Sequence, residues 1–210
     1  MLHAVLDFIS SVAFAVAATF GINMGIERPH YDVIERIGDA VEIRRYQKRI
    51  AAETTVEANK SNNPRSEAFR AVAGYIFGAN KGRQKIDMTA PVEISSSRDK
   101  IVMTTPVEVK SSDSGLVMRF FMPAKYSREQ LPEPSDPRVK LIELPPTTVA
   151  VLRFSGSTDD AAVTIYTVML MKALQSTKWK VAGPATACFY NPPWTLPFLR
   201  TNEVAVPVSK

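Results

Sequence analysis

A strand–turn–strand pattern occurs twice in this chain, and the duplication limits the fold more than any other feature. Residues 31–46 align without gaps on residues 139–154, 108 positions further along. In both segments apolar residues alternate with polar ones, as expected for strands with one buried face. The matched pairs include Ile34 with Ile142, Glu35 with Glu143, Ile43 with Val151 and Arg45 with Arg153. The alignment predicts two related halves, about 27–123 and 136–208.

A helix is expected after each hairpin. Asn63 and Pro64 are typical of a helix start, and the first helix should run from about 64 to 77. Its apolar residues recur at helical spacing: Phe69, Val72, Ala73, Ile76 and Phe77. The second helix, about 158–175, begins near Asp159 and Asp160, which suit a first turn. Its stripe is Val163, Tyr166, Leu170 and Leu174.

Further strands are expected after each helix, at 101–109, 116–122, 186–190 and 203–208. Together these elements predict an α+β fold. A duplicated β-α-β unit, whose strands merge into one sheet or barrel with a helix in each half, explains the pattern. The repeats and their barrel should occupy residues 27–210, and an apolar helix should precede them.

The N-terminal segment 1–26 differs from the rest. Residues 8–26 are apolar apart from a few small polar side chains, and as a helix they would reach about 28 Å, close to one hydrocarbon thickness. Gly21 and Gly25 form a G-x-x-x-G pair, which allows close helix packing in lipid. Three interpretations stay open: a single-pass membrane anchor, a cleaved signal peptide, or a helix docked on protein. Basic residues follow the segment and none precedes it, which favours a cytoplasmic barrel. An exported, periplasmic protein is the alternative.

Composition excludes several classes of function. Lys and Arg number 26 against 21 Asp and Glu, and this mild excess is too thinly spread to indicate nucleic-acid binding. The chain has one cysteine, Cys188, and two histidines, His3 and His30. An intrachain disulfide is therefore impossible, and a zinc site of the usual nitrogen and sulfur ligands is nearly excluded.

No catalytic constellation stands out. Cys188 falls in an expected strand with no histidine nearby in sequence, which is typical of a small buried side chain. Glu35 and Glu143 occupy matching positions of the two hairpins and could face each other across a cleft. The alternative for both is an exposed strand carboxylate. The remaining expectation from the residues alone is an apolar cleft rich in Met, Phe and Trp, which suits a large flat ligand with basic groups at its rim.

Six sequence motifs, which follow one another along the chain, point to a known protein family. They are GDAVEIRRY (38–46), EAFRAVAGYIFGANKG (67–82), KIDMTAPVE (85–93), MRFFMPAKY (118–126), DPRVKLIELP (136–145) and YNPPWTLPFLRTNEV (190–204). The chain resembles the SOUL heme-binding proteins over about 27–208. The resemblance implies a distorted antiparallel β-barrel, built from two pseudo-symmetric β-α-β repeats and flanked by two helices. It also implies binding of heme or a related porphyrin, without established catalysis.

The resemblance also implies where a tetrapyrrole would lie. It would rest against the first helix, on apolar side chains, with basic groups near its propionates. The ligand-binding residues expected from this placement are Phe69, Arg70, Ala73, Tyr75, Phe77, Lys81, Met88, Trp194 and Arg200. Arg45 stands where one branch of the family has a proposed histidine ligand, so no protein ligand to the iron is expected. Tyr46 and Tyr75 are the remaining oxygen donors, with core or rim positions as the alternative.

Three functions follow from these observations. The first is a membrane-associated, non-catalytic tetrapyrrole-binding protein. The second is an accessory subunit of a membrane complex, attached through its N-terminal helix at Gly21 and Gly25, with a decayed pocket. The third rests on a likeness of the expected barrel to effector-binding domains, and is a hydrolase that uses Glu35 or Glu143.

Overall fold

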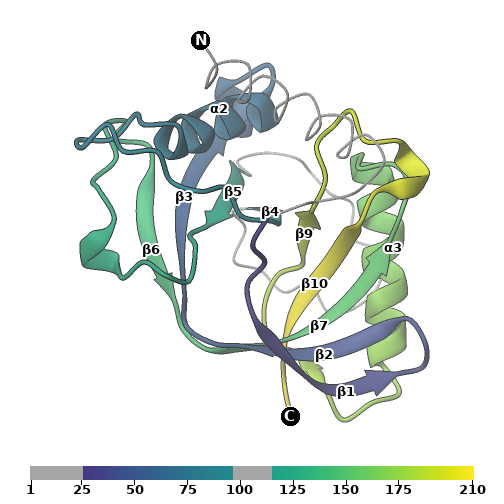
Figure 1. Ribbon diagram of the computed structural model, residues 1–210. Helices are drawn as coiled ribbons and strands as arrows, with labels where there is room; N and C mark the ends of the chain where they lie inside the picture. The colour runs from purple at the N-terminus through teal and green to yellow at the C-terminus, as the bar shows by residue number, and fades with distance from the viewer. Residues whose placement is uncertain (1–25, 97–114) are drawn as a thin grey trace, which may run out of the picture.

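The computed structural model describes residues 26–96 and 115–210 (Figure 1). The strands are β1 (Tyr31–Ile37), β2 (Val41–Tyr46), β3 (Arg49–Glu57), β4 (Val92–Ser96), β5 (Gly115–Phe121), β6 (Lys140–Leu144), β7 (Thr147–Phe154), β8 (Lys180–Val181), β9 (Thr186–Phe189) and β10 (Asn202–Ser209). The helices are α2 (Pro64–Ile76) and α3 (Asp160–Leu174), with short 3-10 turns at Ala58–Lys60, Arg128–Gln130 and Pro197–Leu199. The predicted α+β class is confirmed.

The strands form one curled antiparallel sheet in the order β1-β2-β7-β10-β9-β4-β5-β3-β6, with β8 paired to β10. Within the described residues no ladder joins β1 to β6, so the sheet is a curled half-barrel open at these two edges, which agrees with the expected distorted antiparallel barrel. Helix α2 packs on β3 and β5, and α3 packs on β7 and β10. Figure 1 shows the two helices over different halves of the sheet.

The structure changes the register of the duplication. Apart from β1 and β8, the strand order is symmetric about the β9–β4 pair, so that β2 corresponds to β6 and β3 to β7. Tyr46 pairs with Thr147 and Arg49 pairs with Leu144 across the two halves, which places equivalent residues 98 positions apart. The offset of 108 matched β1-β2 with β6-β7 and was therefore wrong.

The error arose because β3 was not expected. This strand is rich in Ala, Thr and Glu, and only two residues, Gln47 and Lys48, separate it from β2. Ala51 and Ala52 are nevertheless fully buried, because their small side chains allow close packing on both faces of β3. The repeat unit is thus strand–strand–helix–strand–strand, β2-β3-α2-β4-β5 and β6-β7-α3-β9-β10.

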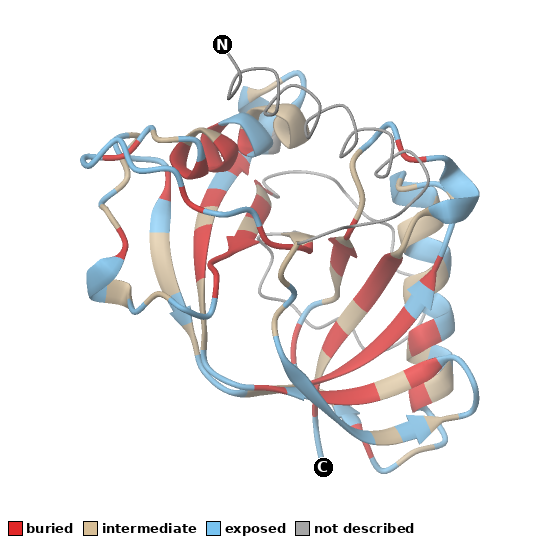
Figure 2. Ribbon diagram, viewed as in Figure 1, coloured by how far each residue is buried: buried red, intermediate tan, exposed pale blue. Residues whose placement is uncertain are grey.

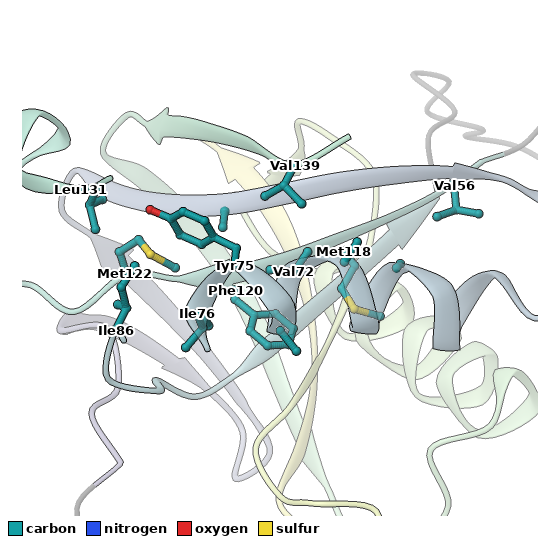
Figure 3. Packing of buried hydrophobic residues seen from close by; sticks show 14 residues of the cluster. Val56, Val72, Tyr75, Ile76, Ile86, Met118, Phe120, Met122, Leu131 and Val139 are labelled. Atoms are coloured by element: carbon teal, nitrogen blue, oxygen red, sulfur yellow. The ribbon is translucent and has the colours of Figure 1, made fainter. Parts of the chain in front are cut away.

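Helix α2 begins where the sequence indicated. The Asn63 side chain accepts a hydrogen bond from the Ser66 amide (3.0 Å), which satisfies one of the free amides at the helix start. Gly78, at φ 108°, turns the chain away after the last helical residue, Ile76. Val72 and Ile76 are buried against Phe120 and Met118 of β5, as the close view in Figure 3 shows.

The expected stripe of α2 is only partly buried. Phe69 and Phe77 lie on its outer side and remain 43% and 61% exposed, because Ala68, Ala71 and Tyr75 complete the buried face in their place. The expected stripe of α3 is confirmed: Val163, Tyr166, Leu170 and Leu174 all pack in the core cluster of the second half. Figure 2 shows that both helices carry buried residues alongside exposed ones.

Two expectations fall outside the described residues. These are the apolar segment, of which the structure describes only Ile26, and the strand at 101–109. Within 26–96 and 115–210, neither helix has the length and apolarity needed to cross a membrane.

Candidate functional site

The outer side of α2 carries an apolar strip of three expected site residues. Phe69, Ala73 and Phe77 are spaced four residues apart, so they lie along one side of the helix over about 12 Å. Phe69 is held by an edge contact with the buried Phe120 ring, with 5.4 Å between ring centroids. Ala73, 6% exposed, is the small residue between the two rings. The strip thus offers two aromatic side chains to a flat apolar ligand.

Arg70 lies beside this strip. Its Nε donates a weak hydrogen bond to the Ser66 carbonyl of its own helix, at 3.3 Å. Among the described residues no carboxylate forms an ion pair with Arg70. Its guanidinium can therefore meet an anionic group of a ligand on α2, as the sequence predicted.

Met88 and Trp194 are also exposed, at 40% and 59%. Met88 belongs to the segment that returns from α2, where the Ile86 amide donates to the Ile76 carbonyl. Trp194 belongs to the loop between β9 and β10, and the base of this loop, Tyr190, packs against Ala90. The fold therefore brings the two segments that carry Met88 and Trp194 to the same end of β4 and β9.

Three of the expected site residues have other roles. Lys81 forms an exposed ion pair with Glu133. Arg200 donates to the carbonyls of Thr195 (2.8 Å) and Pro193 (2.7 Å), so its guanidinium holds its own loop. Tyr75 is 1% exposed, and its hydroxyl donates to the Pro132 carbonyl at 2.9 Å. It belongs to the core.

The tyrosines do not suit an iron site. Burial raises the pKa of Tyr75 to about 12, and burial likewise raises the pKa of Tyr46 to about 12. Both phenols therefore stay protonated near neutral pH, whereas a ligand to ferric iron would be a phenolate. His30 is exposed and borders a different cavity, formed with Lys48 and Tyr126. The described part of the chain contains no cluster of His, Cys, Asp and Glu able to hold a metal ion.

Glu35 and Glu143 do not face each other. They lie on β1 and β6, the two outermost strands of the sheet. Glu35 accepts hydrogen bonds from Trp179 Nε1 (3.0 Å) and Lys178 Nζ (2.9 Å), and the Lys178 bond, followed by that of Trp179, lowers its pKa. Glu143 pairs with Lys48 at 2.9 Å. The expected pair across a cleft was wrong, because the two residues are not equivalent under the true register.

Two other carboxylates, Glu203 and Glu93, were not predicted from the sequence and lie together in one cleft. They line a cavity of about 220 Å³ on the sheet face opposite the helices. Glu203, 2% exposed, accepts two hydrogen bonds from Arg44 Nη1 (3.0 and 3.1 Å) and one from the Tyr190 hydroxyl (2.6 Å). One signal was present: Glu203 is the single charged residue of the otherwise mostly apolar strand β10.

Burial governs the titration of this inner face. It raises the pKa of the Cys188 thiol and of the Tyr190 phenol well above their usual ranges, and the Glu203 carboxylate adds to the effect on both. A group whose pKa is raised on folding contributes stability below its unfolded pKa, and this stability is lost as the pH rises through the folded value.

We therefore expect alkaline sensitivity above about pH 9, where unfolded Cys and Tyr begin to ionise. The midpoint of urea unfolding should fall steadily between pH 8 and pH 11, and Cys188 should react with a thiol reagent only after unfolding. Rapid modification of Cys188 in the native protein at pH 8 would contradict the buried assignment.

The sequence and the fold are similar to those of known proteins. The family model for "SOUL heme-binding protein" matches residues 26–207. No curated protein matches the chain. Among solved structures, the EcmrR C-terminal domain is 13% identical, with 86% of this chain and 98% of that one covered and a TM-score of 0.57. A hydrolase from Listeria innocua is 11% identical, with coverage of 81% and 92% and a TM-score of 0.58.

The two structural likenesses show a shared fold at low identity. The family match is more specific. It covers residues 26–207, from five residues before β1 to near the end of β10, and includes every motif quoted above. The chain belongs to the SOUL heme-binding protein family.

Proposed function

We propose that this protein binds heme or a related porphyrin reversibly on the outer side of α2. The observation that carries the proposal is the strip on α2, where the exposed Phe69 and Phe77 flank the buried Ala73 beside Arg70. Exposed aromatic side chains at regular spacing on a helix are costly unless they serve an interface, and family membership supports a tetrapyrrole as the occupant. Met88 and Trp194 would extend the apolar contact.

The chain's own residues supply contact and orientation in this proposal. Phe69 and Phe77 would lie against the flat face of the ring, with Ala73 leaving room between them. Arg70 would meet a propionate by charge-assisted hydrogen bonds and so orient the ring on the helix. The heme iron would supply any redox chemistry, and the proposal gives Met88 an apolar contact with the ring and no bond to the iron.

The affinity for a porphyrin should therefore depend little on whether the ring holds iron. We expect hemin and metal-free protoporphyrin IX to bind with dissociation constants within about threefold of each other, because apolar contact and one cation contribute equally to both. Absorption and fluorescence titrations of the full chain test this directly. Hemin binding at least tenfold tighter than protoporphyrin, with a spectrum typical of a nitrogen or sulfur ligand, would point to an axial ligand and refute the iron-independent site. Absence of any spectral shift with either would refute the function itself.

We further propose that the N-terminal segment 8–26 attaches the protein to a membrane, with the barrel domain on the cytoplasmic side. The length and apolar character of the segment support the attachment, and the basic residues after it support this side. Deleting residues 1–26 should move the protein from the membrane fraction to the soluble fraction. Retention in the membrane fraction after the deletion would show that another surface makes the attachment.

A second candidate function, an accessory subunit, is favoured by the outer face of α3. Ile165, Val168 and Met169 are 59%, 61% and 50% exposed, so this helix is apolar on both of its faces. Such a face suits contact with another apolar helix. Loss of partner subunits from the isolated complex on Val168→Lys, with porphyrin binding intact, would support this candidate over the first.

A further inference from the structure

The inner face of the half-barrel holds an arginine whose side chain has no acceptor. Arg49 begins β3, and its guanidinium lies over the Tyr46 ring at 4.1 Å and near the Phe121 ring at 4.9 Å from the centroids. Cation–π contacts of this kind hold the planar group by its faces. Its N–H donors, which point outward in the plane of the group, stay available along the edge.

No oxygen of the described residues uses these donors. Arg49 Nε is fully buried and has no hydrogen-bond partner, and no ion pair involves the side chain. An unsatisfied buried donor costs stability, more so when it is charged. Burial accordingly lowers the pKa of Arg49. Other arginines of the described inner face differ, because Arg44 and Arg153 pair with Glu203 and Arg119 pairs with Glu53 and Glu93.

Glu93, which also lines the cavity, does not fill this role. Glu93 exerts an attractive field on Arg49, but its Oε1 accepts from Arg119 Nη1 at 2.8 Å. Arg119 Nε in turn donates to Glu53 at 2.6 Å. Arg119 thus holds both acidic groups, and the edge of Arg49 stays open toward the cavity that it lines.

The rest of the cavity is mainly apolar. Besides Arg49 and its two aromatic neighbours, the walls include Pro91, Leu144, Val149, Ala205 and Pro207. A volume of about 220 Å³ lies below the range of roughly 300–1,000 Å³ usual for drug-sized ligands. A tetrapyrrole is therefore too large, and a compact molecule fits.

We propose that this cavity binds a compact monocarboxylate with a flat apolar body, whose carboxylate pairs with the edge of Arg49. Guanidinium and carboxylate are both planar, and parallel N–H···O bonds between them match in geometry. The apolar part of the ligand would lie against the prolines and aliphatic walls. This site is separate from the strip on α2, which lies on the other face of the sheet.

The cavity favours a single negative charge. Glu93 and Glu203 also line it, and each is already matched to an arginine. A phosphate dianion would bring a second negative charge close to these carboxylates without a second free cation, and like charges at short range disfavour binding. A neutral isostere such as benzamide would lack the charge-assisted bond altogether.

The test uses benzoate as the probe and the full chain as the receptor, with isothermal titration calorimetry as the readout. We expect wild-type protein to bind benzoate at least tenfold more tightly than benzamide or inorganic phosphate. Arg49→Met should weaken benzoate binding at least tenfold. Arg45→Met is the matched control, because Arg45 is an exposed arginine on the neighbouring strand β2, and its replacement should leave binding unchanged.

Stability provides a second readout. Arg49 is half-buried, and its replacement removes a charged donor that no described acceptor satisfies. Arg49→Met should therefore keep or raise the melting temperature, so that the loss of binding cannot be ascribed to misfolding. Equal benzoate affinity of wild type and Arg49→Met, or no benzoate binding by the wild type, would overturn the proposal. A melting temperature lowered by Arg49→Met would also count against it, since it would show that the guanidinium is needed for the fold. Phe77→Ser should not change benzoate binding, which separates this site from the porphyrin site.

Discussion

Arg44→Met should lower the free energy of unfolding by about 3–5 kcal/mol, the range for removing one partner of a buried ion pair. Arg44 and Glu203 are both 2% exposed, and Arg44 Nη2 adds a third hydrogen bond to Glu203 at 3.1 Å. Burial lowers the pKa of Arg44 and is the largest single influence, but the charge of Glu203 and the contacts with Tyr46 and Glu42 together outweigh it and raise the pKa. Without Arg44, the Glu203 carboxylate stays buried with the Tyr190 hydroxyl and the more distant Arg153 as partners, which is why the cost is large.

Urea unfolding followed by circular dichroism measures this effect. Arg45→Met provides the control, because Arg45 is exposed and adjacent in β2, and it should change the free energy of unfolding by less than about 0.5 kcal/mol. The double variant Arg44→Met with Glu203→Leu should recover much of the loss, since both charges are then absent. If Arg44→Met unfolds like the wild type, the buried pair does not form as described.

Replacing both Phe69 and Phe77 by Ser should weaken porphyrin binding by about 30-fold. Full burial of a Phe side chain is worth about 1.5–3 kcal/mol, and roughly half of each ring is still exposed in the free protein, so each contributes about 1 kcal/mol on binding. Two such losses amount to about 2 kcal/mol, which corresponds to about a 30-fold change in affinity. Fluorescence titration with protoporphyrin IX is the measurement.

Folding of this variant needs a separate check. Phe69 contacts Phe120 of the core, so its loss also costs stability, whereas Phe77 at 61% exposure can be changed alone with little effect on the fold. Ile165→Ser is the matched control, because Ile165 is equally exposed on the other helix. Unchanged porphyrin affinity in Phe77→Ser and in the double variant would place the ligand elsewhere.

The sequence alone predicted local structure well where a single local pattern, such as a helix cap or an apolar stripe, determines it. The Asn63–Pro64 start of α2 and the apolar stripe of α3 follow from backbone capping and from helical spacing, which need no distant partner. Long ordered motifs were enough to recognise the family. Duplication was also visible, because both halves repeat the alternation of strands.

The tertiary structure decides which strands pair and which side chains turn toward the core or toward solvent. The strand β3 carries mostly Ala, Thr and Glu, and becomes a central strand only because β5 and β6 pair with it on both sides. That pairing shifted the repeat to 98 positions and separated Glu35 from Glu143. Of the expected site, Phe69, Arg70 and Phe77 stay on one exposed helix side, while Tyr75 turns into the core.

The inner face could not be read from the chain, because its members lie far apart in sequence. Arg44 and Glu203 meet across 159 positions, and Arg49 reaches its aromatic neighbour Phe121 through the pairing of β3 with β5. In each strand the charged residue alone looks like a solvent-exposed side chain. Only the curl of the sheet, which turns these positions toward one enclosed space, makes them buried partners. Local signals therefore determined the helices and the family, and the long-range pairing of strands determined both the buried charge cluster and the cavity beside it.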